Sequence, residues 1–296
     1  MESRTFTIAG LNIRLQFLPS EKNGLWLLPS FQSFLSASNE TSDVFFTLVV
    51  DDSLIPAPNK RLVRTFDTGN GDTVVYQLFN GGYQYIIRDI RGRDCCLLIT
   101  DERFTNCRCA LNGDGVMRSF GLNDALMLIF AFAGSFRQTI LIHASCIMLG
   151  ENAYPFIAES GTGKSTHTSL WMKYIEGAEL LNDDNPIIRI LDDGYPYIYG
   201  SPWSGKTPCY RNHCARLGAV TRIERAPSNS IRQMAPVQAF ASLLPACSSM
   251  KWDIAIYNNL CDTVTRIIEN IPVYTLYCLP DEEAARLCHK TLTKNK

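Results

Sequence analysis

The sequence predicts an α+β protein of two domains, a β-rich domain over residues 1–120 followed by an α/β domain over residues 121–296. Three observations support this prediction. The first part consists mostly of strand-like runs separated by Asn-Gly and Gly-Asp turns. From residue 121 onward, strand-like and helix-like segments are mixed. A chain of 296 residues, 46% of them hydrophobic, is also long enough to form two domains with cores of their own.

Four strand-like runs predict the β-rich domain. One of them contains FNGGYQYIIRD, in which Asn-Gly-Gly between apolar runs is typical of a hairpin turn. No catalytic constellation stands out in these residues, so we expect this domain to support the other domain or to recognise a partner. The runs are RTFTIAGLNIRLQF, SDVFFTLVVDD, TVVYQLFNGGYQYIIRDI and DCCLLIT.

A helix near residues 121–137 opens the α/β domain. Its apolar stretch ALMLIFAFAG is shorter than the roughly 20 residues that cross a bilayer, so we expect a buried core helix that begins at Asn123 or Asp124. The segments expected after it are strands in TILIHASCIML, AYPFIAES, AELLNDDNPIIRILDDGYPYIYG, LGAVTRIERA and PVYTLYCLP, and helices in KSTHTSLWMKYI, residues 235–270 and DEEAARLCHKTL.

The composition argues against some classes of partner. The formal net charge is −1 and the pI is near 6.4, whereas nucleic-acid-binding proteins normally carry a basic excess. The first residues, MESRTFTIAGLNIRLQF, lack the basic start and continuous apolar stretch of a signal peptide. We therefore expect a cytoplasmic protein with no nucleic-acid or membrane partner.

The cysteines are typical of reduced, buried thiols. There are eleven, an odd number, and several lie in apolar strand-like runs, as Cys146 and Cys278 do. One cluster invites interpretation as a zinc site, but its adjacent pair and C-x-C spacing differ from the usual pair of C-x₂₋₄-C motifs. We therefore do not expect a metal at the cluster, which comprises Cys95, Cys96, Cys107 and Cys109.

The segment FIAESGTGKSTHT resembles a phosphate-binding loop, Gly-x₄-Gly-Lys-Ser/Thr, except that Ala158 occupies the first glycine position. Gly161 and Gly163 can adopt the backbone angles that turn N–H groups toward phosphate oxygens. Lys164 would contact the β- and γ-phosphates, and the Ser165 hydroxyl would face Mg²⁺. Alanine fits the first position if its φ is ordinary. The alternative is a glycine-containing turn that happens to carry a lysine.

The segments that flank this loop favour the phosphate-binding interpretation. An apolar, aromatic run precedes it, and apolar residues at helical spacing follow it. A strand, a glycine turn and a helix N-terminus together form an anion site, because free N–H groups and the helix dipole both attract negative charge. The residues expected to bind the nucleotide are Ser160, Gly161, Thr162, Gly163, Lys164, Ser165 and Thr166.

An acidic pair, Asp183 and Asp184 in LLNDDNPIIR, lies between apolar runs. A carboxylate at a strand end near phosphates can hold Mg²⁺, and a neighbouring carboxylate can accept the proton of an attacking hydroxyl. The alternative is a solvated turn, which we expect for the aspartates of LDDG at residues 191–194. The apolar flanks favour a functional pair.

Three further residues are weaker candidates. His143, in the apolar run LIHASCIML, would by itself be a packed core histidine. Lys206, in the second glycine-containing loop GSPWSGKT, could neutralise charge on a transferring phosphoryl group, or it could be a surface lysine of a Pro-Trp turn. Arg211 is a candidate for the same task.

The His143 strand, SGTGKST and the Asp-Asp pair together resemble the catalytic core of HPr kinase/phosphorylase, which belongs with the phosphoenolpyruvate carboxykinase-type nucleotide-binding fold. Four segments are also similar to a group of bacterial HPr-kinase-like proteins, which are often encoded near peptide-modification genes. These segments are ESGTGKSTHTSLW, NDDNPIIR, YGSPWSGKT and IPVYTLYCLPDEEAARL. The resemblance covers residues 121–296. The sequence contains no counterpart of the segment by which the HPr enzyme recognises its protein substrate. It also contains no counterpart of the carboxykinase arginines or Mn²⁺ site.

The resemblance implies a role for each matching residue. Lys164 becomes a phosphate ligand, Ser165 a Mg²⁺ ligand, and Asp183 with Asp184 the base and a second metal contact, for which Asp184 is the metal candidate. His143 becomes a polar active-site residue near the phosphates. The HPr enzyme forms hexamers, so a homo-oligomer is a further expectation.

Two functions are therefore expected, with ATP and Mg²⁺ as cofactors. The first is a kinase that transfers the γ-phosphoryl group to a hydroxyl of a peptide, a protein or a small molecule. The second is a nucleotide-binding module with little or no catalysis, in which the β-rich domain binds a partner. A carboxykinase-like enzyme, dependent on a small keto acid, is a third alternative.

Overall fold

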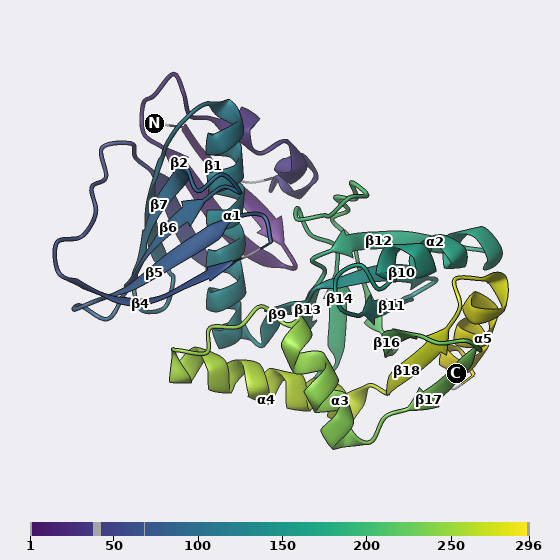
Figure 1. Cartoon of the computed structure of the whole chain (residues 1–296). Helices are drawn as coiled ribbons and strands as arrows, with labels where there is room; N and C mark the ends of the chain where they lie inside the picture. Colours follow the sequence, from purple (N-terminus) through teal and green to yellow (C-terminus); the bar gives the residue numbers. More distant parts are fainter. Residues whose placement is uncertain (1, 38–42, 68, 295–296) are drawn as a thin grey trace. The chain divides into compact units, whose positions relative to one another are not determined.

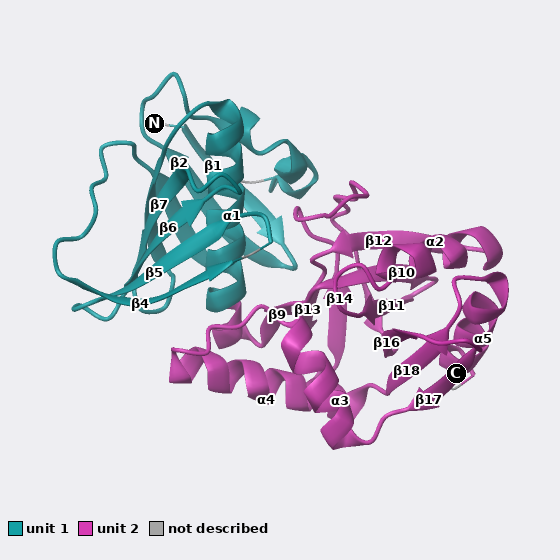
Figure 2. Cartoon of the chain, viewed as in Figure 1, with its two compact units in different colours: residues 1–133 teal, residues 134–296 magenta. Residues whose placement is uncertain are grey.

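The computed structural model of the chain describes residues 2–37, 43–67 and 69–294. The chain divides into two units, residues 1–133 and 134–296 (Figure 2). The first contains a mostly antiparallel sheet, and the second contains a mixed α/β sheet with parallel strands. The prediction of an α+β protein with an N-terminal β-rich domain is therefore confirmed.

The first unit is built on an eight-stranded sheet in the order β1-β2-β3-β8-β7-β6-β5-β4. Neighbouring strands are antiparallel except for the parallel pairs β2–β3 and β3–β8. The expected hairpin joins β5 and β6, where Gly81 has a φ of 92°. The strands are β1 (Glu2–Ile8), β2 (Leu11–Phe17), β3 (Phe46–Val50), β4 (Lys60–Asp67), β5 (Asp72–Leu78), β6 (Tyr83–Arg88), β7 (Asp94–Thr100) and β8 (Asn106–Leu111).

Helix α1 (Gly115–Gly134) packs on this sheet. The rings of Phe130 and Phe132 lie 5.7 Å and 5.5 Å from those of Phe45 and Phe104. These contacts explain why the first unit extends to residue 133, beyond the domain boundary expected after residue 120. The expected start at Asn123 or Asp124 is wrong, because the Asp114 carboxylate accepts from the N–H groups of the first turn.

The helix is also longer than its most apolar stretch. The segment Gly115–Arg137, which comprises α1 and the 3₁₀ turn η3 (Ser135–Arg137), is long and apolar enough to cross a membrane by length and composition. Most of it, 61% of the apolar window, is buried in the folded chain. The sequence-based argument from length is therefore wrong, whereas the burial is typical of the expected core helix.

The second unit contains a ten-stranded sheet. Its order is β17-β18-β16-β11-β15-β14-β13-β9, and β10 pairs with both β11 and β12. The strands β11, β16 and β18 are parallel neighbours. The strands are β9 (Thr139–Leu141), β10 (Ala144–Leu149), β11 (Asn152–Ile157), β12 (Ala178–Asp184), β13 (Ile187–Ile190), β14 (Pro196–Tyr199), β15 (Cys214–Leu217), β16 (Val220–Arg225), β17 (Ser230–Gln233) and β18 (Val273–Cys278).

Helices cover both faces of this sheet (Figure 1). On one face α2 (Lys164–Tyr174) and α5 (Glu282–Leu292) bury Trp171 and Cys288 against Tyr154 and Phe156 of β11. On the other face α3 (Pro236–Leu243) and α4 (Ile254–Asn270) pack on strand residues that include Ala153 and Ile157. Because successive strand residues point to opposite faces, β11 contributes to both cores.

The run TILIHASCIML, expected as one strand, forms two. β9 pairs with β13, whereas β10 pairs with β11 and β12. The change of partner occurs at Ile142 and His143, whose N–H groups donate to the carbonyls of Pro186 and Ala246. His143 therefore immediately precedes β10 and lies outside the regular ladder.

The cysteines are free thiols, and most are buried. Burial raises the pKa of Cys278 to about 11 and raises that of Cys146 further. The cluster of four cysteines lies within β7 and β8. In the part of the chain that the structure describes, no three His, Cys, Asp or Glu side chains are grouped so that they could hold a metal ion.

Trp171 is the largest fully buried side chain of the second core, and its ring lies 5.5–5.7 Å from those of Tyr154, Phe156 and His289. We expect Trp171→Ala to lower the free energy of unfolding by about 3–5 kcal/mol, because the cavity joins three packed elements. The neighbouring Met172 is 41% exposed, so Met172→Ala is the matched control and should cost less than about 1 kcal/mol. Urea denaturation measures both, and similar losses would contradict the packing described here.

Candidate functional site

The expected strand, loop and helix occur in that order. β11 ends at Ile157, residues 158–163 form the loop, and α2 begins at Lys164. Gly161 and Gly163 have φ angles of 77° and 128°, which side chains disfavour. Ala158 is not among the residues with positive φ, so alanine at the first position of the pattern requires no unusual backbone.

Arg225, at the end of β16, stabilises the loop. Its Nη2 and Nε donate to the carbonyl oxygens of Gly161 (2.6 Å) and Thr162 (3.0 Å). Sequence reasoning missed this residue. The only sequence signal for it is its place at the carboxyl end of a strand, where loops gather in parallel sheets.

Lys164 points back along the loop and toward β10. Its Nζ lies 2.8 Å from Nε2 of His143 and donates to the Ala158 carbonyl at 3.2 Å. Partial burial lowers the pKa of the Lys164 ammonium, while the charges of Asp184 and Asp183 oppose this shift. The Lys164 ammonium therefore lies between the His143 ring and the Ala158 carbonyl, at the start of the loop.

The acidic pair lies beside this lysine because β12 pairs with β10. In this antiparallel ladder Asp184 is opposite Ala144, and Asp183 is opposite Ser145. Asp183 is buried and its Oδ1 accepts from the Ser165 hydroxyl at 2.9 Å. The expected Mg²⁺-facing hydroxyl and a carboxylate are therefore in direct contact.

His143 connects the lysine to the second carboxylate. Its Nδ1 lies 2.9 Å from Oδ1 of Asp184, and its Nε2 faces Lys164. Because an ammonium group can only donate, the hydrogen-bond network assigns Nε2 as the acceptor and places the ring proton on Nδ1. The imidazole thus holds Asp184 in position, and the interpretation of His143 as a packed core residue is wrong.

Asp184 has a strained backbone. Its φ of 134° is rare for a residue with a side chain and costs on the order of 1–3 kcal/mol. Three contacts hold the conformation: a hydrogen bond from His143 Nδ1 to Asp184 Oδ1 (2.9 Å), a hydrogen bond from Asn185 Nδ2 to Asp184 Oδ2 (2.8 Å), and a β-bridge to Ser204. Strain of this kind clusters at functional sites.

The second loop, residues 200–207, is fixed against the acidic pair. The Asp183 carbonyl accepts from Gly205 N–H and from the Ser204 hydroxyl. Buried Asn182 donates to the Trp203 carbonyl at 3.1 Å, which ties the loop to β12. Lys206 is exposed and, among the described residues, makes no hydrogen bond or ion pair. The loop lies at the site, whereas the Lys206 side chain extends into solvent.

One other sequence candidate, Arg211, lies outside the site. Arg211 donates to the Leu180 carbonyl (2.9 Å) and pairs with Glu179 (2.6 Å), near the opposite end of β12 from the aspartates. Its guanidinium is therefore engaged away from the loop, contrary to expectation. The aspartates of LDDG form a turn, as expected, in which Asp193 accepts from Tyr195 N–H.

His167 belongs to the core. Its Nε2 accepts from Trp171 Nε1 at 3.1 Å, and its ring meets Phe156 edge-on at 4.7 Å. Burial lowers the pKa of His167 to about 4, so the ring is neutral at pH 7. It therefore packs beneath the loop as a neutral acceptor.

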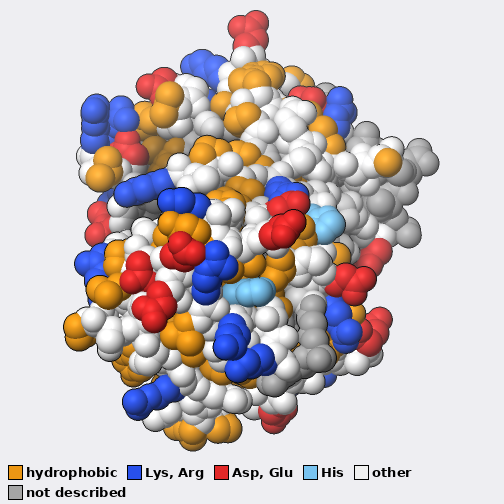
Figure 3. Space-filling model, turned by 90° about the vertical axis from the view of Figure 1, so that its right-hand side faces the viewer, with side chains coloured by type: hydrophobic (Ala, Val, Ile, Leu, Met, Phe, Trp, Pro, Cys, Tyr) orange, Lys and Arg blue, Asp and Glu red, His pale blue; other side chains and the backbone are white. Residues whose placement is uncertain are grey.

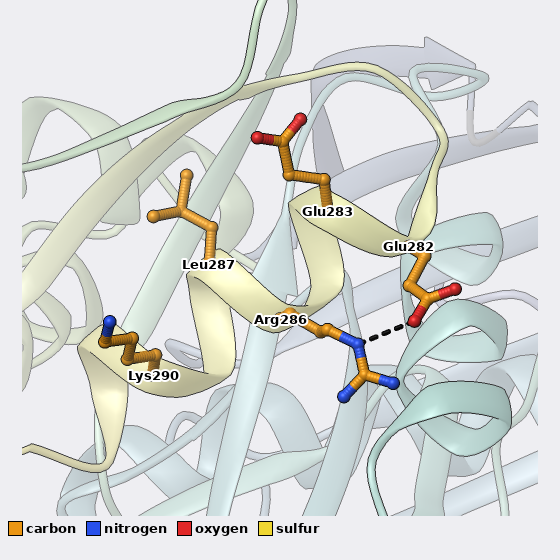
Figure 4. A pocket seen from close by; sticks show the side chains of 5 residues that line it. All are labelled: Glu282, Glu283, Arg286, Leu287 and Lys290. Carbon is orange, nitrogen blue, oxygen red and sulfur yellow. Dashed lines mark hydrogen bonds and ion pairs between the residues drawn. The ribbon is translucent and has the colours of Figure 1, made fainter.

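Pockets adjoin the loop and helix α5 among the described residues of this unit. One of about 390 Å³ adjoins Glu159–Thr162, and one of about 450 Å³ adjoins the loop and the start of α2. The third, of about 550 Å³, lies on the outer side of α5, where Arg286 pairs with Glu282 (Figure 4). That outer pocket is lined by one helix only, so it is a surface groove.

The surface charge is mixed. Figure 3 shows Lys and Arg side chains interspersed with Asp and Glu on the face toward the viewer. This distribution accords with the formal net charge of −1. On this face the Lys and Arg side chains do not form a continuous basic patch of the kind that tracks a nucleic-acid backbone.

The structure thus brings five of the expected residues together around one loop. Two oxygen ligands suited to Mg²⁺ and a cation suited to phosphates are grouped around this loop. The five residues are His143, Lys164, Ser165, Asp183 and Asp184.

Comparison with known proteins gives no match. No model of a known protein family matches the chain, and no curated protein matches it.

The strain at Asp184 predicts that a residue optimal for the site is not optimal for stability. We expect Asp184→Gly to raise the free energy of unfolding by about 1 kcal/mol, because glycine adopts positive φ without the steric cost. The matched control is Asp183→Gly, where φ is not positive and a buried hydrogen bond is lost, so stability should fall by roughly 1–3 kcal/mol. Chemical denaturation of both tests this, and a large loss for Asp184→Gly would show that its side-chain contacts outweigh the strain.

Proposed function

We propose that this protein is a Mg²⁺/ATP-dependent kinase that transfers the γ-phosphoryl group to a hydroxyl. The observation that carries the proposal is the continuous set of contacts Lys164–His143–Asp184, beside the Ser165–Asp183 pair. The set lies at a glycine loop on a helix N-terminus, where N–H groups attract phosphate. The fold we propose for this unit is the HPr kinase/carboxykinase-like P-loop type.

The residues present fit both ATP and Mg²⁺. The loop N–H groups and Lys164 suit the phosphates, because positive φ at two glycines turns the backbone as such a cradle requires. Ser165 and Asp183 provide a hydroxyl and a carboxylate in contact, which are hard oxygen ligands. Bound Mg²⁺ supplies charge neutralisation on phosphoryl oxygens. This geometry favours Asp183, more than Asp184, as the metal contact.

Asp184 is then the candidate base. It accepts the proton of the acceptor hydroxyl as that oxygen bonds to the γ-phosphorus, and the bond from phosphorus to the bridging oxygen breaks to release ADP. The Nδ1–H group of His143 donates a hydrogen bond to Asp184 and thereby orients the carboxylate. Lys164 holds the phosphates, whereas the exposed Lys206 side chain is assigned no role in the transfer.

The acceptor is a serine of a peptide or protein, or a small-molecule alcohol. The resemblance to HPr-kinase-like proteins encoded near peptide-modification genes favours a peptide.

Steady-state ATP turnover tests the proposal. We expect Asp184→Asn and Lys164→Ala each to lower turnover at least 100-fold, because a base and a phosphate ligand act mainly in the transition state. Asp192→Asn and Lys173→Ala alter the same residue types at exposed positions outside the site and should leave turnover within about twofold of wild type.

The outcomes separate the two functions. Unchanged turnover in folded Asp184→Asn and Lys164→Ala would refute the kinase. Nucleotide that binds to the wild type but is never consumed, with any hydroxyl acceptor, would instead identify a nucleotide-binding module.

A further inference from the structure

We infer that the pocket of about 450 Å³ beside the loop holds the nucleoside part of the nucleotide, with a purine base against its apolar wall. This inference rests on the proposed function and specifies which part of the ligand gives selectivity. The pocket is within the range of about 300–1,000 Å³ typical of small-molecule sites. It is built by three separate elements, so it is not a groove along one helix.

The walls combine phosphate-facing backbone with apolar side chains. The Gly161–Gly163 turn and the start of α2 form one side. Ile223 and Arg225 of β16 form the second, and the segment after β18, with Leu279 and Pro280, forms the third. A flat base needs apolar surface and a few fixed polar groups, and these walls provide both.

The strand order places this pocket on the opposite side of the loop from the acidic pair. β10 and then β12, with the aspartates, lie on one side of β11; β16 and then β18, with the pocket walls, lie on the other. In phosphate loops the lysine reaches the β- and γ-phosphates and the glycine turn holds the α- and β-phosphates. A nucleotide with its γ-phosphate at Lys164 therefore directs its nucleoside away from Asp184, toward β16 and β18.

Arg225 adds a fixed cation to the wall formed by β16. Its guanidinium is held by the carbonyls of Gly161 and Thr162 and also lines the pocket. Arginine stacks on aromatic rings more favourably than lysine does, because its charged group is planar and weakly hydrated. A purine presents more ring surface than a pyrimidine, which favours a purine nucleoside.

The third wall is held in place by Asn229. Its Oδ1 accepts from Leu279 N–H at 2.9 Å, and its Nδ2 donates to Asp281 at 3.1 Å and to Glu283 at 2.9 Å. Asp281 in turn caps α5 by accepting from Ala284 N–H. A wall that is ordered by the protein's own contacts costs the ligand little conformational entropy, as expected of a preformed site.

The test compares Mg²⁺/ATP with Mg²⁺/tripolyphosphate, which has the phosphates but no nucleoside, by calorimetric titration of the full chain. We expect the wild type to bind ATP at least tenfold more tightly than tripolyphosphate, and more tightly than CTP. Leu279 is 40% exposed, so the fold should tolerate Leu279→Ser. This variant should weaken ATP binding about five- to tenfold and leave tripolyphosphate binding unchanged.

Leu287→Ser is the matched control, because Leu287 lines the groove on the outer side of α5 (Figure 4). It should leave the affinities for ATP and for tripolyphosphate unchanged.

Asn229→Ala is a second test variant, and it should weaken ATP binding without affecting tripolyphosphate binding.

Four results would overturn the inference. Equal affinity of the wild type for ATP and tripolyphosphate would exclude a nucleoside site while leaving the phosphate loop and the proposed kinase intact. Equal weakening of both ligands by Leu279→Ser, or ATP binding unaffected by Leu279→Ser and Asn229→Ala, would show that the pocket belongs to something else, such as the acceptor. Binding of neither ligand by the wild type would remove the proposed function together with the inference.

Discussion

The antiparallel pairing of β10 with β12 determines where the polar groups of the site lie. It sets Asp184 opposite Ala144, beside His143, and Asp183 opposite Ser145, within reach of Ser165. The register shifts between Cys146 and Ile147, so β12 contains an extra residue at that point. Because side chains alternate between faces, one extra residue reverses which face the following carboxylates occupy. The bulge therefore sets the face on which Asp183 meets Ser165, whereas the adjacent Asp184 is held at its positive φ by its contact with His143.

The same region combines strain with dense hydrogen bonding. The unfavourable φ of Asp184 persists because His143, Asn185 and the bridge to Ser204 restrain it from three directions. Behind it, buried Asn182 fixes the second loop to β12. Rigid support of this kind lets a carboxylate and a cation lie close together without solvent reorganisation. The proposed phosphoryl transfer would depend on such positioning more than on covalent chemistry.

Features that depend on local sequence could be predicted, and those that depend on distant partners could not. The strand, loop and helix around Lys164 follow from glycines and helical spacing in one segment, and the α+β class follows from the segment pattern. The break at His143, the contacts of Arg225 and the engagement of Arg211 with Glu179 depend on strands far apart in the chain. The start of α1 could not be predicted from its most apolar stretch, because the helix begins well before that stretch, where the Asp114 carboxylate accepts from Met117 N–H.

The central claim is that the loop binds nucleotide phosphates although Ala158 replaces a glycine. Calorimetric titration of ATP into the wild type, with and without Mg²⁺, tests it most directly. The geometry predicts saturable binding that strengthens with Mg²⁺, because Ser165 and Asp183 would supply oxygen ligands for the ion. The absence of binding at ATP concentrations well above those in cells would contradict the claim and would direct attention to the N-terminal β-sheet unit.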